Sequence, residues 1–248
     1  FAMLDKTVKP SAIFASSSSS INPSALIPGG ESRQVAGLHF FYPVPLKNIV
    51  EITLAPSTSA ETRLELESFL DSIKRRYITL EEPDSFILNK IFLDFQVEAF
   101  QVVHDGESTF LQMDQLVKKY FFAFGVFDFC DSVGLDTMKS AVVNYTAHYP
   151  DRKKYDLFLA SLGSLVSAGK LGFKTHEGFH KYPLTEQPGD EPEHAAEIED
   201  HLRQTWICAC KKFTQSASVP VDQMNSALEE YFGIELSPFE KLLLNPPD

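Results

Sequence analysis

Residues 35–54 read VAGLHFFYPVPLKNIVEITL. Two apolar runs, 35–41 and 49–54, flank a turn that contains two prolines, so the segment predicts two neighbouring buried strands. Each run holds one ionisable side chain, His39 in the first and Glu51 in the second. A buried polar side chain needs a hydrogen-bond partner, and these two satisfy each other if the turn places their strands side by side. The alternative is a core histidine whose ring is satisfied by backbone groups.

Strands and helices alternate on both sides of this segment. An apolar run at 11–15 leads into five serines at 16–20. Beyond the two strands, the apolar spacing predicts an amphipathic helix at 59–75 and a short strand at 77–80. This alternation predicts an α/β domain with a mainly parallel sheet. Ligands of such sheets bind beyond the carboxyl ends of strands, so the serine run is a candidate binding loop, with a flexible low-complexity loop as the alternative.

The pattern changes at Pro83, after which helical spacing of the apolar residues dominates. The first predicted helix, at 85–106, carries a wide apolar stripe. Further helical patterns lie at 111–124, 132–148, 154–168 and 197–215. The second part of the chain is therefore predicted to be an all-α domain.

The predicted segments of the chain are an α/β part at 1–83, a helical domain at 84–184, an acidic linker at 185–196 and a further helical segment at 197–248. The last segment echoes the earlier helices, because MDQL at 113–116 recurs as VDQM at 221–224. This similarity predicts a partial second helical repeat that packs on the first. Chance similarity between two amphipathic helix pairs is the alternative.

Composition narrows the classes of function. The 248 residues carry a net charge of −12, which argues against a nucleic-acid groove because phosphates are neutralised by clustered Lys and Arg. No apolar run approaches the roughly 18 residues that a membrane helix needs. Three cysteines are too few for a disulfide framework, which favours a reducing intracellular compartment without distinguishing cytoplasm, mitochondrial matrix or a peroxisome-like organelle. The stretch HEGFH at 176–180 matches a zinc-protease pattern, but Gly178 disfavours the helix it needs, so no metal site is predicted.

Five distinctive stretches follow one another along the chain: IFASSSSSI at 13–21, GLHFFYPVPLKNIVEIT at 37–53, PDSFILNKI at 83–91, SVGLDT at 132–137 and LGFKTHEGFHKY at 171–182. In content, order and spacing they resemble the 3-hydroxyacyl-CoA dehydrogenase family, and the tail resembles the partial second helical repeat of some members. The resemblance implies that residues 1–83 are the trailing half of a Rossmann-like NAD-binding domain, followed by the family's helical C-terminal domain. None of the 12 glycines forms the phosphate-binding turn G-x-G-x-x-G, so the other half is expected before Phe1, and this chain alone is not expected to bind NAD normally.

The activity that this resemblance implies is NAD-dependent oxidation of a (3S)-3-hydroxyacyl-CoA to a 3-ketoacyl-CoA in fatty-acid β-oxidation. By resemblance, His39 takes the proton of the substrate hydroxyl as general base and Glu51 orients its ring. Ser19 and Asn89 match residues that bind the substrate, which is an acyl-CoA. Cofactor contacts are implied for Ser17, Ser19, Tyr42 and Lys174.

The sequence also departs from the family's pattern. Ser17 and Tyr42 both stand where the family commonly has asparagine, and the phenol of Tyr42 cannot make the same amide hydrogen bonds. A second hypothesis is therefore a non-catalytic homologue with a structural or interaction role. A third is that the chain is one module of a multifunctional β-oxidation enzyme. For assembly, a homodimer and a monomer whose repeats pack within one chain both remain open.

Overall fold

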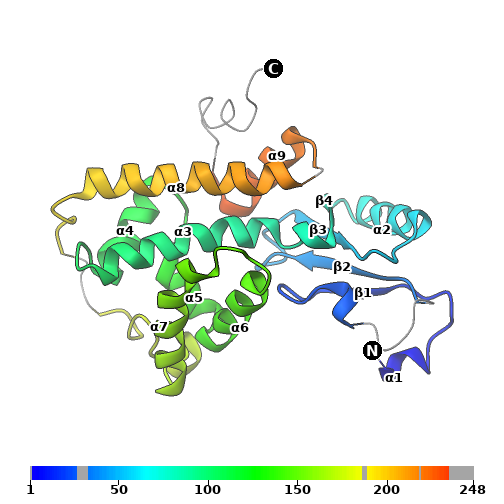
Figure 1. Ribbon diagram of the computed structural model, residues 1–248, viewed down its shortest axis with the longest axis horizontal. Helices are drawn as coiled ribbons and strands as arrows, with labels where there is room; N and C mark the ends of the chain where they lie inside the picture. The colour runs from blue at the N-terminus through cyan, green and yellow to red at the C-terminus, as the bar shows by residue number, and fades with distance from the viewer. Residues whose placement is uncertain (1, 27–32, 186–188, 218, 235–248) are drawn as a thin grey trace. The chain divides into compact units, whose positions relative to one another are not determined.

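The computed structural model describes residues 2–26, 33–185, 189–217 and 219–234 (Figure 1). These residues belong to two compact units. The first unit contains the chain up to Leu88 together with Lys211–Tyr231, and the second contains Asn89–Cys210 with Phe232–Ile234. A segment from far along the sequence, 211–231, therefore belongs to the same unit as the first 88 residues.

The first unit holds a four-stranded sheet in the order β1-β2-β3-β4. Its strands are β1 (Phe14–Ser16), β2 (Val35–Phe40), β3 (Ile49–Leu54) and β4 (Arg76–Glu81). The pairs β1–β2 and β3–β4 are parallel, whereas β2–β3 is antiparallel. The link between β2 and β3 is too short for the crossover that a parallel pair requires, which explains this one departure from a parallel sheet. The predicted partial Rossmann-like α/β sheet is confirmed.

The two faces of the sheet differ in character. One face packs against α2 (Ala60–Ser72), whose first turn is capped by the side chain of Ser59 accepting from the N–H of Thr62. The apolar residues that form this core are Ala36, Leu38, Val50, Ile52, Leu54, Leu66 and Leu70. Side chains alternate along a strand, so the intervening residues of β2 and β3, which include His39 and Glu51, point to the opposite face.

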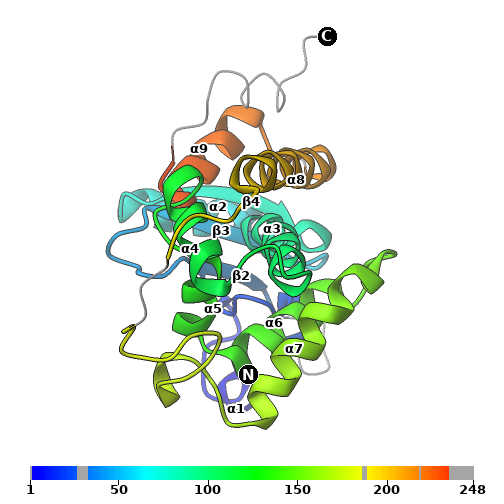
Figure 2. The same ribbon diagram turned by 90° about the vertical axis from the view of Figure 1, so that its left-hand side faces the viewer.

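Helices make up most of the second unit, and the first unit also contains the short helix α1 (Ala2–Asp5). The longer helices that follow α2 are α3 (Ile87–His104), α4 (Phe110–Tyr120), α5 (Val126–Val133), α6 (Leu135–Thr146), α7 (Asp156–Ser167), α8 (Ala195–Ser216) and α9 (Val221–Phe232). In the second unit α5 and α7 both pack beside α6 (Figure 2). The predicted helical domain is confirmed, but α5 was not predicted, because its eight residues are too few for a clear helical period.

Aromatic rings fill the core of the second unit. Phe92 of α3 lies 5.6 Å, centroid to centroid and edge to face, from Phe122, and Phe95 lies 5.0 Å from the same ring. Edge-to-face pairs of this kind place a positive ring edge against a negative ring face. This packing accounts for part of the excess of phenylalanine, which contributes 21 of the 248 residues. Within the described ranges, no helix is both long and apolar enough to cross a membrane.

Candidate active site

A buried pair of ionisable side chains lies on the sheet face opposite α2. The antiparallel register places His39 of β2 directly across from Glu51 of β3. Nδ1 of His39 lies 2.9 Å from Oε2 of Glu51, and the two residues are 3 % and 0 % exposed. The predicted pairing of the two side chains is confirmed, so the ring has a carboxylate partner instead of backbone groups alone.

The first turn of α3 holds the other oxygen of Glu51. Its Oε1 accepts a hydrogen bond of 3.1 Å from the backbone N–H of Leu88, the second residue of that helix. The first amides of a helix have no partner within the helix, so a carboxylate is a favourable acceptor for them. A carboxylate only accepts hydrogen bonds, hence Nδ1 of His39 donates and Nε2 keeps the lone pair. The pair therefore presents an oriented base.

Aromatic rings enclose the imidazole of His39. The ring of Phe41 lies 4.3 Å away and that of Phe86 lies 5.8 Å away, edge-on. Phe86 adopts a φ of 59°, in the left-handed region that a bulky residue rarely occupies. Such a conformation costs roughly 1–3 kcal/mol and persists only where surrounding packing holds it. Here it directs the Phe86 ring to the imidazole immediately before α3 begins.

Three residues with predicted cofactor roles lie at one edge of the sheet. Because β1 and β2 run parallel, their carboxyl ends meet at the same edge. Ser17 and Ser19 follow β1 and are exposed, and Tyr42 follows β2 and is 86 % exposed. The structure thus brings these side chains to the edge where ligands of open α/β sheets bind.

The residues at this edge fit one part of a dinucleotide. Serine and tyrosine hydroxyls donate and accept hydrogen bonds, which suits a neutral polar group such as a carboxamide or a ribose. The phosphates need a glycine-rich turn at a helix N-terminus, and that motif is missing from the sequence. The hydroxyls at this edge therefore fit the neutral groups of a dinucleotide but not its phosphates.

The remaining predicted site residues, Asn89 and Lys174, belong to the second unit. Nδ2 of Asn89 donates to the hydroxyl of Tyr145 on α6 at 2.9 Å. The ammonium of Lys174 pairs with Asp136, and this hydrogen bond lowers the pKa of the Asp136 carboxyl. Sequence reasoning missed Tyr145. Asn89 and Tyr145 are 56 residues apart, and a helical pattern does not indicate which distant side chain a tyrosine hydroxyl contacts.

A second buried polar cluster fixes the stretch that resembled a zinc-protease motif. Nε2 of His180 lies 2.8 Å from Oδ2 of Asp114, whose oxygens also accept from the backbone N–H groups of Phe127 and Asp128 at 2.8 and 2.9 Å. The motif's first histidine, His176, has a φ of 60° in a turn, so the two histidines do not share a helix face.

Asp114, Asp128 and His180 place one possible metal-ligand atom each within 4.8 Å of one another. The two backbone amides already occupy the oxygens of Asp114, and Lys118 pairs with Asp128 at 2.6 Å. The ammonium group of Lys118 already supplies the positive charge that a metal ion would bring. The cluster is therefore explained by its hydrogen bonds. It is called the brace below and consists of Asp114, His180 and the backbone amides of Phe127 and Asp128.

The histidine of this brace makes stability depend on pH. Burial alone lowers the pKa of His180, but its hydrogen bond to Asp114 and the charges of Asp114, Asp131 and Asp128 raise the pKa above its ordinary value of about 6.5. The folded state then binds the proton more tightly than the unfolded state. This stabilisation is complete below pH 6.5 and is lost as the pH rises through the folded pKa.

We therefore expect the denaturant midpoint of the second unit to fall as the pH is raised above 6.5. Unfolding followed through the single tryptophan, Trp206, measures it. A His180→Gln variant isolates the effect, since its midpoint lacks this component of the pH dependence. A wild-type midpoint that tracks the variant at every pH contradicts the assignment.

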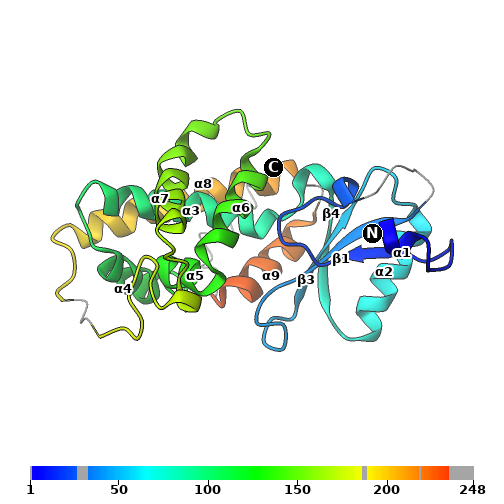
Figure 3. The same ribbon diagram turned by 90° about the horizontal axis from the view of Figure 1, so that it is seen from below.

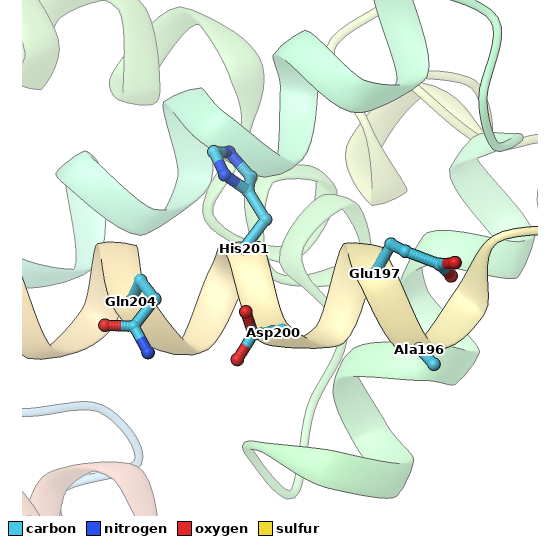
Figure 4. A pocket seen from close by; sticks show the side chains of 5 residues that line it. All are labelled: Ala196, Glu197, Asp200, His201 and Gln204. Atoms are coloured by element: carbon cyan, nitrogen blue, oxygen red, sulfur yellow. The ribbon is translucent and has the colours of Figure 1, made fainter.

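An open depression lies along α8, and none of the predicted site residues belongs to that helix. Its lining residues are Ala196, Glu197, Asp200, His201 and Gln204 (Figure 4). His201 pairs with Glu98 of α3 at 3.3 Å, and both are solvent-accessible. The depression is shallow, and none of the residues predicted for the site lines it.

Comparison with known proteins assigns both parts of the chain to one family. Residues 1–83 match the model described as "3-hydroxyacyl-CoA dehydrogenase, NAD binding domain", and residues 86–182 match its "C-terminal domain". The "Hydroxyacyl-coenzyme A dehydrogenase, mitochondrial" of Sus scrofa is 34 % identical over 187 residues, which cover 73 % of this chain and 58 % of that protein. The chain thus spans little more than half the length of this relative.

Solved structures show the same likeness. A (S)-3-hydroxybutyryl-CoA dehydrogenase from Ralstonia eutropha is 29 % identical with a TM-score of 0.63, over 73 % of this chain and 64 % of that one. The 3-hydroxybutyryl-CoA dehydrogenase of Escherichia coli, at 17 % identity, shares the fold over 98 % of this chain and 72 % of its own, with a TM-score of 0.74. The chain belongs to the 3-hydroxyacyl-CoA dehydrogenase family.

Proposed function

We propose that the protein oxidises a (3S)-3-hydroxyacyl-CoA to the 3-ketoacyl-CoA with NAD, as a step of fatty-acid β-oxidation. The observation that carries this proposal is the buried His39–Glu51 pair, with Nδ1 of His39 held 2.9 Å from the carboxylate. A pair of this kind has no structural necessity in an apolar sheet, since two apolar residues would pack there without polar partners. It suits a reaction that removes a proton from an alcohol.

His39 acts as the general base in this proposal. Its Nε2 takes the proton from the 3-hydroxyl of the substrate, and bound NAD supplies the acceptor for the hydride from the same carbon. The imidazolium that forms is stabilised by Glu51, whose other oxygen stays fixed on the N–H of Leu88. The carboxylate therefore sets both the tautomer and the direction of the ring.

Neutral polar groups are assigned to the oxygen that changes from hydroxyl to carbonyl. Ser19 and Asn89 are proposed to bind it, because donors that carry no charge serve both states of the oxygen. Ser17, Ser19, Tyr42 and Lys174 are proposed to contact the cofactor. Whether the protein acts as a homodimer or as a monomer with packed repeats stays a prediction.

The test uses the complete protein with 3-hydroxybutyryl-CoA and NAD, and follows the formation of NADH by its absorbance. We expect turnover that depends on both substrates. A fluorescence titration with NADH runs in parallel. A complete protein that neither turns over nor binds NADH contradicts the proposal and favours a non-catalytic homologue.

The hydroxyl of Tyr145 is proposed to position Asn89, and this gives a further prediction. The Tyr145→Phe variant loses the hydrogen bond of 2.9 Å to Nδ2 of Asn89. A hydrogen bond of this kind contributes about 0.5–1.5 kcal/mol, so we expect kcat/KM to fall about twofold to tenfold. Steady-state kinetics measure this loss.

Two controls separate positioning from general damage. Tyr149→Phe removes another hydroxyl that is largely buried in the same unit and leaves kcat/KM close to that of the wild type. In an Asn89→Ala background, Tyr145→Phe causes no additional loss if it acts through Asn89. An additive loss in the double variant contradicts the role of Tyr145.

A further inference from the structure

Three aromatic rings run from the candidate base to the last described helix. The ring of Phe41 lies 4.3 Å from the imidazole of His39, and the ring of Tyr231 on α9 lies 4.4 Å from Phe41. Phe41 and Tyr231 are both buried. The three rings, called the ring stack below, are tilted against one another by 57° and 48°. All three belong to the first unit. Phe41 therefore packs between His39 and Tyr231 and connects the two side chains.

The C-terminal end of α9 is fastened to the segment that follows β2. Nζ of Lys47 donates to the backbone oxygens of Tyr231 at 2.7 Å and Glu230 at 3.4 Å. The backbone N–H of Asn48 donates to Oε1 of Glu230 at 2.9 Å. A cation stabilises the unpaired carbonyls at a helix C-terminus, so Lys47 caps α9 where Tyr231 enters the ring stack.

The cost of burying Lys47 shows that this cap is a specific arrangement. Burial lowers the pKa of the Lys47 ammonium, while the charge of Glu230 opposes that shift. Arg75 fixes the same segment from the other side, since its guanidinium donates to the carbonyls of Val44 at 3.1 Å and Lys47 at 2.8 Å. The loop after β2 is therefore held by charged groups on both sides.

A separate contact joins α9 to the sheet away from the ring stack. Nη1 of Arg76, at the start of β4, donates to the hydroxyl of Ser226 at 3.1 Å. Figure 3 shows α9, in orange, near the sheet to which this bond joins it. This bond helps to dock α9 and involves neither Phe41 nor His39. It provides a matched control, because its removal takes one hydrogen bond from α9 and none of the contacts within the ring stack.

The hydrogen bond to Glu51 fixes only one atom of the imidazole. Rotation of the ring about that atom is limited by what packs against its faces, and Phe41 is the nearer of the two aromatic neighbours. We propose that α9 is a positioning element for His39, and that Tyr231 acts by pressing Phe41 against the imidazole. The proposal rests on the proposed function, in which Nε2 of His39 takes the substrate proton.

The family models that match this chain end at residue 182, so α9 lies outside both. The proposal therefore assigns a role in the site to a segment that those models do not include. Because a displacement of about 1 Å in a reacting group costs up to about 10²-fold in rate, a modest relaxation of the ring stack has a measurable effect on kcat.

The experiment uses the complete enzyme and three variants. Tyr231→Leu keeps an apolar side chain but removes the ring, Tyr231→Phe keeps the ring, and Ser226→Ala removes only the bond to Arg76. We expect Tyr231→Leu to lower kcat about tenfold, with the KM values for acyl-CoA and NAD within about twofold of wild type. Tyr231→Phe and Ser226→Ala keep the wild-type kcat. In a His39→Gln background, Tyr231→Leu causes no additional loss.

A second readout does not depend on turnover. The imidazole C–H proton resonances of His39 are expected to shift in Tyr231→Leu and to stay in place in Ser226→Ala. If Tyr231→Leu does not fold, Lys47→Met, which removes the cap of α9 but keeps an apolar stem, takes its place with the same expected results.

The outcomes separate this inference from the proposed function. An unchanged kcat in Tyr231→Leu, or an equal loss in Ser226→Ala, overturns the role of the ring stack while wild-type turnover upholds the function. If the wild-type enzyme shows no turnover, the function fails, and an unmoved His39 resonance in Tyr231→Leu then overturns the inference separately.

Discussion

We expect the replacement of His39 with glutamine to lower kcat of the complete protein by about 10³- to 10⁴-fold, because glutamine has no basic nitrogen to take the substrate proton in the proposed reaction. The variant also leaves the buried carboxylate of Glu51 without the imidazole that it orients, while the bond from the N–H of Leu88 remains. Stopped-flow or steady-state measurements of NADH formation quantify the loss of kcat. Circular dichroism and the affinity for NADH check that the variant folds and still binds cofactor.

Glu51→Gln is the matched variant for this result. The amide is nearly the same size as the carboxylate but carries no charge to balance the imidazolium, so we expect a smaller loss of about 10²-fold. The order of the two effects follows from their proposed roles, in which His39 takes the proton and Glu51 acts through His39. Undiminished turnover in His39→Gln contradicts the assignment of His39 as the base. A larger loss of kcat in Glu51→Gln than in His39→Gln contradicts the assignment of the two roles.

Replacing Asp114 with alanine destabilises the second unit by about 3–5 kcal/mol. Asp114 is buried and accepts from His180 and from the N–H groups of Phe127 and Asp128, so its loss leaves two buried donors and one half-buried donor without this acceptor. Gly125 packs against this side chain so closely that an added Cβ would lie 2.4 Å from Cγ of Asp114. The surrounding chain is thus built around the aspartate.

Denaturant unfolding of the complete protein, followed through Trp206, measures this change, because the tryptophan is buried in the second unit. Asp105→Ala is the control. Asp105 is an exposed aspartate that accepts hydrogen bonds from Gln101, one helical turn away, so we expect its loss to change the stability by no more than about 0.5 kcal/mol. Equal unfolding midpoints for Asp114→Ala and wild type would refute the account of the brace.

The candidate base was predictable because each half of the pair carries its own signal. His39 and Glu51 each interrupt an apolar strand pattern, and two such interruptions in neighbouring strands predict a contact. The brace gave no comparable signal, since Asp114 and His180 are 66 residues apart in elements of different type. Asp114 sits in a helical pattern where an aspartate is ordinarily exposed, and only packing reveals that its partners are backbone amides.

The sequence by itself determined the strands, the longer helices, the family and the identity of the proposed base, because period and residue type are local properties. The tertiary structure alone decided the hydrogen bond from Asn89 to Tyr145 and the inclusion of α9 in the unit that holds His39. These depend on which surfaces meet when distant segments bury their apolar faces, and no local pattern specifies that choice. The ring stack is the clearest case: Phe41 and Tyr231 each read as ordinary core residues, and their contact gives them a role beside the proposed base.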